Sequence, residues 1–406
     1  MSELERFTGA LIAHDADPPR PPLRRTLPVV LTGLLIAALT AGALAGYGMV
    51  TGAALGEPTD PSAILLDRRT GARYVYLESD HRLHPILNYT SGLLLAAAER
   101  PRVTAVASTR LAGVPLGETL GIPDAPDALP PAEKLLDSAW TVCTEGGAGT
   151  LLVGVSPTGG TVADQALLVR DPTGRTVLVH AGHRFQLPSD RVEATMRALG
   201  WEGRVPGRVA AGWIDAVPAG PDLIAPVVPG AGAASVLPGH RVGEVLTDSG
   251  ARFAVVLADG VAAVTELQAR LLAPPTAVGA EFVRLPPSGR RLRSADDLPA
   301  AIPAIVDLPV RVCVTRPADG PATVRLNPAV PASGPVHVPR GSGAVVTSPA
   351  GAIHLITDAG RAYPLASGAL LARLGYAGVR PVTVPAELIA QLPAGPLLDP
   401  EAAGRR

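Results

Sequence analysis

Thiols and lysines, which carry much of redox and phosphoryl-transfer chemistry, are scarce in this chain. It has two cysteines, Cys143 and Cys313, and its only lysine is Lys134. A phosphate-binding loop places a lysine directly after a glycine-rich turn, in the pattern G-x-x-x-x-G-K-[ST]. Lys134 lies in PPAEKLLDS, which has no such turn before it. The sequence therefore does not predict a Walker-type nucleotide site.

The other polar clusters favour structural roles. His180 and His183 form an H-A-G-H pair at a predicted hairpin turn, and no carboxylate or thiol is placed to complete a metal site. Asp296 and Asp297 precede a predicted helix, where negative charge is favourable. The run GAGAAS at 230–235 is flanked by prolines and is expected to be a connector loop. We therefore predict no catalytic residue, no metal and no cofactor.

The segment from residue 28 to residue 50 is long and apolar enough to cross a membrane. It has no charged residue, and as a helix it would be about 34 Å long. Arg20, Arg24 and Arg25 precede it, so the positive-inside rule places the N-terminus in the cytoplasm and the rest of the chain outside. The alternative is a cleavable secretory signal, because the A-L-A run at 43–45 resembles a cleavage site.

Four stretches of the chain share one pattern. Each has an apolar strand, a glycine turn, a second strand, another turn, a short third strand and a helix. The first-turn glycines, which adopt positive φ without steric cost, are Gly71, Gly174, Gly250 and Gly351. They are 103, 76 and 101 residues apart, which indicates a pair of pairs, each enclosing an insert. Ser189 and Ser367 precede two of the helices and are expected to cap them.

The predicted fold class is α+β, with one transmembrane helix followed by four small β-rich repeats around a central mixed domain. Each repeat has three strands plus a helix, and the two halves are related by a pseudo-two-fold. The expected boundaries are a leader at 1–27, the transmembrane helix at 28–50, a linker at 51–62, repeats at 63–98, 161–202, 241–273 and 339–378, a central domain from 99–160 and 274–338, a connector at 203–240 and a tail at 379–406.

Each insert holds one cysteine in a strand rich in β-branched residues. Cys143 lies in SAWTVCT and Cys313 in LPVRVCVT. Equivalent positions in duplicated halves, in an oxidising compartment, favour a disulfide. Two buried free thiols are the alternative. In the chain-entropy model a bridge that closes a loop of about 170 residues stabilises the fold by roughly 5 kcal/mol.

Several segments form a joint pattern: LLDRRTGARYVYLESDHRLHPILNYTSGLLL after the apolar segment, RLAGVPLGETLGIPDAPDALP at 110–130, SAWTVC at 138–143 and WIDAVPAGPDLIAPVVPGAG at 213–232. In these the chain resembles the EccB component of the type VII (ESX) secretion systems of actinobacteria. The resemblance implies an elongated extracytoplasmic part, a disulfide between Cys143 and Cys313, and membership of a membrane channel complex with EccC, EccD and EccE. The leader is shorter than is typical of that family, and the tail is brief.

These observations favour a structural and interaction protein of the inner membrane. We expect it to be single-pass, to scaffold a secretion channel and to contact copies of itself through its extracytoplasmic domain. The alternatives are a nucleotide hydrolase with a non-Walker site, because the resembled family has sometimes carried an ATPase label, and a secreted binding protein. A net charge of −1 with scattered arginines argues against a nucleic-acid partner.

Overall fold

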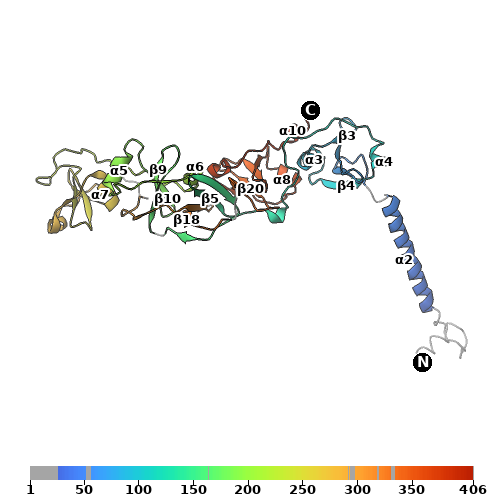
Figure 1. Ribbon diagram of the computed structural model, residues 1–406, viewed down its shortest axis with the longest axis horizontal. Coiled ribbons are helices and arrows are strands. Elements are labelled where there is room, and N and C mark those ends of the chain that lie inside the picture. The colour runs from blue at the N-terminus through green and yellow to red at the C-terminus, as the bar shows by residue number, and fades with distance from the viewer. Residues whose placement is uncertain are drawn as a thin grey trace, which may run out of the picture. The chain divides into compact units, whose positions relative to one another are not determined.

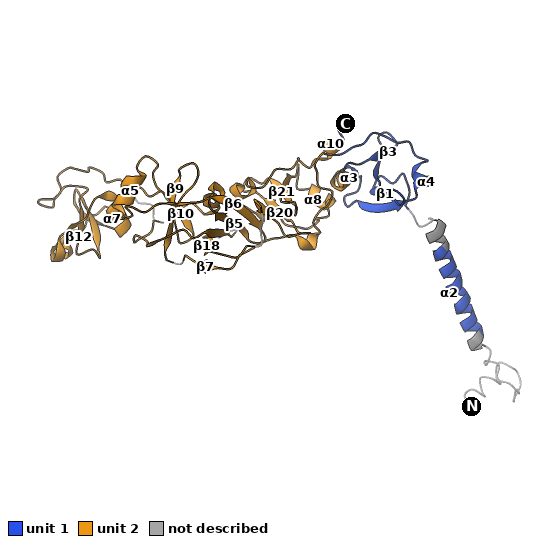
Figure 2. Cartoon of the chain, viewed as in Figure 1, with its two compact units in different colours: residues 1–87, 95–121, 404–406 blue, residues 88–94, 122–403 orange. Residues whose placement is uncertain are grey.

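The structure is a computed structural model that describes residues 26–51, 56–162, 164–290, 292, 298–317, 320–330 and 334–405. The chain divides into two compact units (Figure 2). Unit 1 comprises residues 1–87, 95–121 and 404–406, and unit 2 comprises residues 88–94 and 122–403. Arg20, Arg24, Arg25, Asp296 and Asp297 lie outside the described residues.

Unit 1 contains a long helix and one small sheet. Its elements are α2 (Thr26–Thr51), β1 (Ala63–Asp67), β2 (Arg73–Leu77), β3 (Arg82–Pro85), β4 (Arg102–Val106) and α4 (Ser108–Leu111). Figure 1 labels most of them.

Unit 2 contains the remaining elements. They are α3 (Tyr89–Leu95), η2 (Ala132–Lys134), β5 (Trp140–Glu145), β6 (Ala148–Val153), β7 (Gly160–Thr161), β8 (Ala166–Arg170), β9 (Thr176–His180), β10 (His183–Gln186), α5 (Val192–Ala198), β11 (Gly207–Arg208), α6 (Ala211–Ala216), β12 (Val245–Thr247), β13 (Phe253–Leu257), β14 (Gly260–Val264), α7 (Glu266–Leu272), β15 (Thr276–Ala277), η3 (Gly279–Arg284), β16 (Ile305–Val306), β17 (Arg311–Arg316), β18 (Thr323–Leu326), β19 (Val336–His337), β20 (Ala344–Thr347), β21 (Ile353–Ile356), β22 (Ala362–Pro364), α8 (Leu370–Arg373), β23 (Val382–Thr383), α9 (Ala386–Ile389) and α10 (Pro400–Ala403).

Four sheets share one strand order. Sheet I is β3-β2-β1-β4, sheet II is β10-β9-β8-β11 with β16 also paired to β8, sheet III is β14-β13-β12-β15, and sheet IV is β22-β21-β20-β23. In each sheet the first three strands are antiparallel and the fourth runs parallel to the first. The first-turn glycines have φ of 75°, 90°, 99° and 86° in chain order.

The fourth strand is a difference from the sequence prediction of three strands plus a helix. It follows the helix in each sheet, and in sheets II, III and IV it is only two residues long. Two residues cannot show the alternation of apolar and polar side chains by which strands are recognised in sequence. These strands form because the first strand offers an open edge of backbone donors and acceptors.

A further element follows each fourth strand: a short helix (α4, α6, η3 or α9) and then an extended segment, which we call the strap. The straps are residues 115–120, 218–223, 286–288 and 393–398, and each pairs with the third strand of its sheet. In sheet I, for example, the Leu83 amide donates to the Pro115 carbonyl (2.9 Å), and the Gly117 amide donates to the Leu83 carbonyl (2.8 Å). The short strings VPLG, VPAG, LPPS and LPAG mark the four straps in the sequence.

Three straps place a glycine directly against a ring on the third strand. Added Cβ atoms at Gly117, Gly220 and Gly395 would collide with the rings of His84, Phe185 and Tyr363, respectively. In sheet III the corresponding strap residue is Ser288, beside β14, where Ala262 occupies the ring position. The strap therefore fits its strand by pairing a large residue with a small one.

We expect Gly395→Ala to destabilise sheet IV by about 1–3 kcal/mol, because a methyl group forced against the buried Tyr363 overpacks the site. Amide hydrogen exchange would report it, since the Ala362 amide donates to Pro393 and should lose protection when the strap loosens. Gly289→Ala is the control, because its Cβ would meet only Asp259 at 4.0 Å. Unchanged exchange at Ala362 would contradict this account of the strap.

The expected serine caps are wrong. Arg191 precedes α5 and Ala369 precedes α8, and neither makes a side-chain cap bond. The Arg191 amide donates to the Pro188 carbonyl in a turn, and α5 begins only after this turn. Ser189 is therefore too far from the free amides of the first helical turn. A capping box occurs instead at the start of α7, between Thr265 and Gln268.

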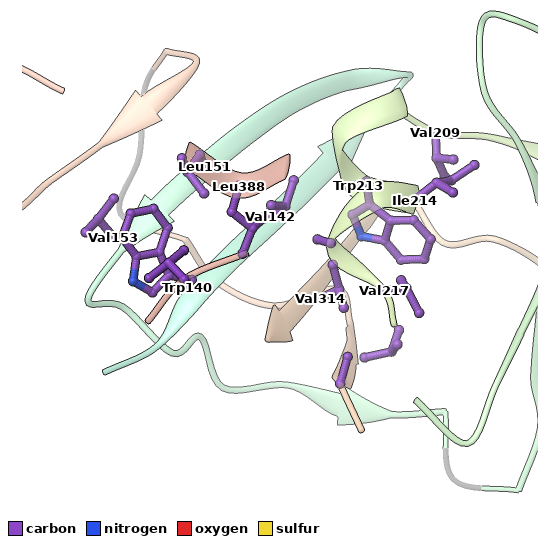
Figure 3. Close-up of a cluster of buried hydrophobic side chains, with 14 of the residues drawn as sticks. Trp140, Val142, Leu151, Val153, Val209, Trp213, Ile214, Val217, Val314 and Leu388 are labelled. Carbon is purple, nitrogen blue, oxygen red and sulfur yellow. The ribbon is translucent and has the colours of Figure 1, made fainter. Parts of the chain in front are cut away.

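A six-stranded central sheet, β19-β6-β5-β17-β18-β7, joins the two segments that the sequence analysis predicted to meet. Strands β5 and β17 are antiparallel neighbours. Their buried side chains form one core with residues of sheets II and IV and of helices α6 and α9 (Figure 3). Trp140, Val142, Trp213 and Leu388 belong to this core. Burial in a shared core positions sheets II and IV against the central sheet.

Candidate functional site

Helix α2 has the length and composition of a membrane-spanning segment. Residues Val29–Gly46 form a stretch without a charged residue and with a high mean hydropathy, none of it buried within the protein. Leu34, Leu39 and Leu44 are more than 60% exposed, which in water is an unfavourable surface for three leucines on one helix. A secretory signal near an N-terminus meets the same criteria of length and composition.

The central sheet contains a disulfide between Cys143 and Cys313. The two residues lie directly opposite each other in β5 and β17, and their Cα atoms are 3.9 Å apart. Both are buried, and beside them the Thr141 and Thr315 hydroxyls are 2.8 Å apart. The bridge thus links strands that are 170 residues apart in the chain.

Helix α6 is attached to sheet II by arginines. Nη1 of Arg184 donates to the carbonyls of Ile214 (2.8 Å), Asp215 (3.2 Å) and Val217 (2.6 Å), and so binds the C-terminal end of α6. A cation at this end is favoured by the helix dipole. Burial nevertheless lowers the pKa of the Arg184 guanidinium.

A second arginine completes this attachment. Arg175 donates to Asp171 (3.0 Å) and to Asp215 (2.9 Å). Burial is the largest influence and lowers the pKa of Arg175, but the hydrogen bonds and charges of Asp215 and Asp171 together outweigh it, so that this pKa rises. Burial likewise raises the pKa of Asp171, yet hydrogen bonds from Thr173 and Arg175 hold that pKa below its ordinary value. These contacts fix the orientation of α6, which carries the fully buried Trp213.

The start of α3 is enclosed by the segment that follows Gly121. Asn88 donates to the Ile122 carbonyl (2.8 Å) and accepts from the Ser91 hydroxyl (2.7 Å). Thr90 donates to the Pro126 carbonyl (2.5 Å). This gives the GIPDAP string a structural role: it satisfies buried polar groups at a helix N-terminus.

The candidate chemical residues that the structure describes do not converge on a catalytic constellation. His180 and His183 oppose each other across the β9–β10 turn, but Nδ1 of His180 faces the Gln165 carbonyl and Nδ1 of His183 faces that of Ala181, each at 3.2 Å. In the 230–235 loop the Gly232 amide is taken by Val242. Lys134 ends the short helix η2. Among the described residues no group of three or more His, Cys, Asp or Glu side chains could hold a metal ion.

Two of the hollows formed by the described residues of unit 2 are large enough for a ligand. One, of about 650 Å³, lies on sheet III and is lined largely by apolar side chains such as Val261, Phe282 and Leu285. The other, of about 600 Å³, lies beside sheet II and includes Arg170, Arg208 and the Gly146–Gly147 turn. The sequence analysis identified neither, because each draws on segments that are far apart in the chain.

Comparison with known families gives one match that covers almost the whole chain. Residues 3–406 match the family described as type VII secretion system ESX-1, transport TM domain B. Two curated relatives are the ESX-3 secretion system ATPase EccB3 of Mycolicibacterium smegmatis, 34% identical over 71% of this chain, and EccB3 of Mycobacterium tuberculosis, 30% identical over 85%. The aligned parts span 60% and 71% of the lengths of those relatives.

Solved structures show the same fold. A chain of an intact ESX-5 inner membrane complex superposes with a TM-score of 0.66 at 25% identity, covering 98% of this chain and 92% of that one. The EccB3 dimer from an ESX-3 core complex superposes with a TM-score of 0.68 at 26% identity, covering 85% and 100%. The likeness therefore includes one N-terminal apolar helix followed by sheet-rich α+β units.

Proposed function

Because this chain belongs to the EccB family of type VII secretion systems, we propose that it is a structural membrane component of a type VII protein secretion channel. The observation that carries the proposal is the superposition, over 98% of the chain, on a chain of an ESX-5 inner membrane complex. In this role the protein anchors to the inner membrane through α2, and its sheet-rich part contacts channel subunits and further copies of itself.

We further propose the internal architecture that suits a scaffold. Sheets I to IV are four copies of one unit, which comprises the four strands, two helices and strap described above. We propose that a pseudo-two-fold relates the first two copies to the last two, which follow them in the chain. The shared strand order, the four straps and the disulfide between β5 and β17 support this. We propose the domain boundaries given under Sequence analysis with one change: each repeat extends to the end of its strap, and the segment that follows it begins correspondingly later.

We propose that the N-terminus is cytoplasmic and the sheets extracytoplasmic. The support is Arg20, Arg24 and Arg25 ahead of the apolar stretch, together with a disulfide, which persists in oxidising compartments. For a protein in this orientation we propose EccC-, EccD- and EccE-like membrane subunits as partners.

We propose a non-catalytic role, although the relatives are named ATPases. A nucleotide hydrolase with a non-Walker site is the alternative that this label favours. Two observations argue against it. The single lysine has no glycine loop before it, and backbone amides of the 230–235 loop already donate to other carbonyls of the chain.

Purified full-length chain in detergent should release no phosphate from ATP above the rate of a preparation heated to denature it. Turnover that disappears with one point substitution would establish the enzyme.

The structural role is tested by extracting the tagged full-length chain from its native membrane in mild detergent. We expect EccC-, EccD- and EccE-like subunits to co-purify in a large complex, and the chain to resist extraction by carbonate without detergent. An unrelated single-span protein carrying the same tag is the control. Recovery of the chain as a soluble monomer, or alone after detergent extraction, would contradict the proposal.

A further inference from the structure

Sheet II carries a pair of arginines that its fold does not require. Arg170 at the end of β8 and Arg208 in β11 are register partners on neighbouring parallel strands. Both are exposed. Like charges on directly opposed residues of neighbouring strands are destabilising. The pair therefore needs an explanation other than sheet formation.

The three sister sheets show what the fold accepts at this position. The equivalent register pairs are Leu66–Ala105 in sheet I, Thr247–Ala277 in sheet III and Thr347–Thr383 in sheet IV. All are uncharged. The fold of the sheet therefore does not require charged residues at this position, and the arginine pair is a feature of sheet II.

The environment of the pair leaves both guanidinium groups accessible. Nε of Arg170 donates to the Thr176 hydroxyl (2.9 Å), which orients the group, and among the described residues its two terminal nitrogens make no hydrogen bond. Among the described residues no acidic side chain makes an ion pair with Arg170 or Arg208. Asp171, which is among the residues that line the hollow, forms an ion pair with Arg175 (3.0 Å).

The rest of the hollow suits an oxyanion. The Gly146–Gly147 turn at the tip of the β5–β6 hairpin also lines it. Both glycines have positive φ, 59° and 90°, and successive turn amides of this kind bind anions. The neighbouring Glu145 is held by Arg311 (2.6 Å). The volume of about 600 Å³ admits a phosphate group together with the molecule that bears it.

From this arrangement we propose that Arg170, Arg208 and the Gly146–Gly147 turn form a binding site for a phosphate group. Two guanidinium forks match the charge and the planar donor geometry that phosphate oxygens require. The site goes beyond the scaffolding role and does not depend on it. The phosphate belongs either to a soluble phosphorylated molecule or to a lipid headgroup, and both present the same oxygens.

The test uses the full-length chain in a detergent solution free of phosphate, with inorganic phosphate as the probe. Binding is measured by calorimetric titration. We expect a dissociation constant of about 1 mM or tighter, weakened at least tenfold in both Arg170→Gln and Arg208→Gln. Arg340→Gln is the control, because Arg340 is exposed and lies outside the hollow. Circular dichroism melting would show that each variant is folded.

Three outcomes would overturn the proposal. They are no heat of binding up to a phosphate concentration about ten times the expected dissociation constant, equal weakening in Arg340→Gln, and loss of fold in both site variants, since the proposal takes the two arginines to be dispensable for the fold. The source of the phosphate is then distinguished with glycerol 3-phosphate and with nanodiscs of anionic phospholipid. Binding of glycerol 3-phosphate alone indicates a soluble ligand, and binding of nanodiscs alone indicates a headgroup.

Discussion

Replacing Cys143 and Cys313 together by alanine should lower the free energy of unfolding by about 2–5 kcal/mol, toward the upper end of that range because the closed loop is long. The bridge joins strands 170 residues apart, and without it the unfolded chain regains the freedom to separate them. The native strands would still pair, so we expect the same fold with a lower denaturation midpoint.

Urea denaturation of the full-length chain in detergent, followed by far-UV circular dichroism, would measure the effect. Because both cysteines are almost fully buried, reductant should act on the native chain only when denaturant opens the central sheet. The double variant supplies the matched control, since reductant should not shift its midpoint. If the midpoints of the variant and the native chain coincide, the disulfide contributes no stability and this expectation is wrong.

Trp213→Ala should have an effect of similar size, about 3–5 kcal/mol, which is the usual cost of emptying a buried tryptophan site. Trp213 is fully buried on α6, in the core shared by the central sheet and sheets II and IV. Figure 3 shows it beside Ile214 and Val217. The cavity left behind cannot collapse easily, because Arg184 and Arg175 hold α6 in place.

Trp213→Phe separates packing from polarity. Nε1 of Trp213 is buried with no hydrogen-bond partner, so phenylalanine removes an unsatisfied donor while it keeps most of the ring. We expect it to be much less destabilising than alanine in the same urea titration. Val310→Ala is the surface control, because Val310 is 76% exposed, and it should change stability by less than about 0.5 kcal/mol. Equal losses for alanine and phenylalanine would show that the indole shape itself is required.

The membrane segment and the turns were predictable because they depend on local composition. A helix across a bilayer needs a long stretch without charge, and residues 28–50 provide one; the structure has α2 over Thr26–Thr51. Gly71, Gly174, Gly250 and Gly351 could be recognised because positive φ is a property of single residues, and all four adopt it. Cys143 and Cys313 could be paired because the chain has no other cysteine.

The expected serine caps failed because a helix start depends on the turn before it as well as on its own sequence. The position of Ser189 is set by the turn at Pro188, which no pattern of apolar residues reveals. The straps had a signal in the strings VPLG, VPAG, LPPS and LPAG, but its meaning requires the third strand of each sheet to be known first.

The amino-acid sequence by itself determined the apolar span, the repeated strand-turn pattern and the two thiols, because each follows from neighbouring residues or from a count. Only the tertiary structure decided the two-residue fourth strands, the straps, the attachment of α6 by Arg184 and the meeting of Arg170 with Arg208. The physical reason is that backbone pairing and charge proximity act across space. Their partners here are tens of residues apart, beyond the reach of any local pattern.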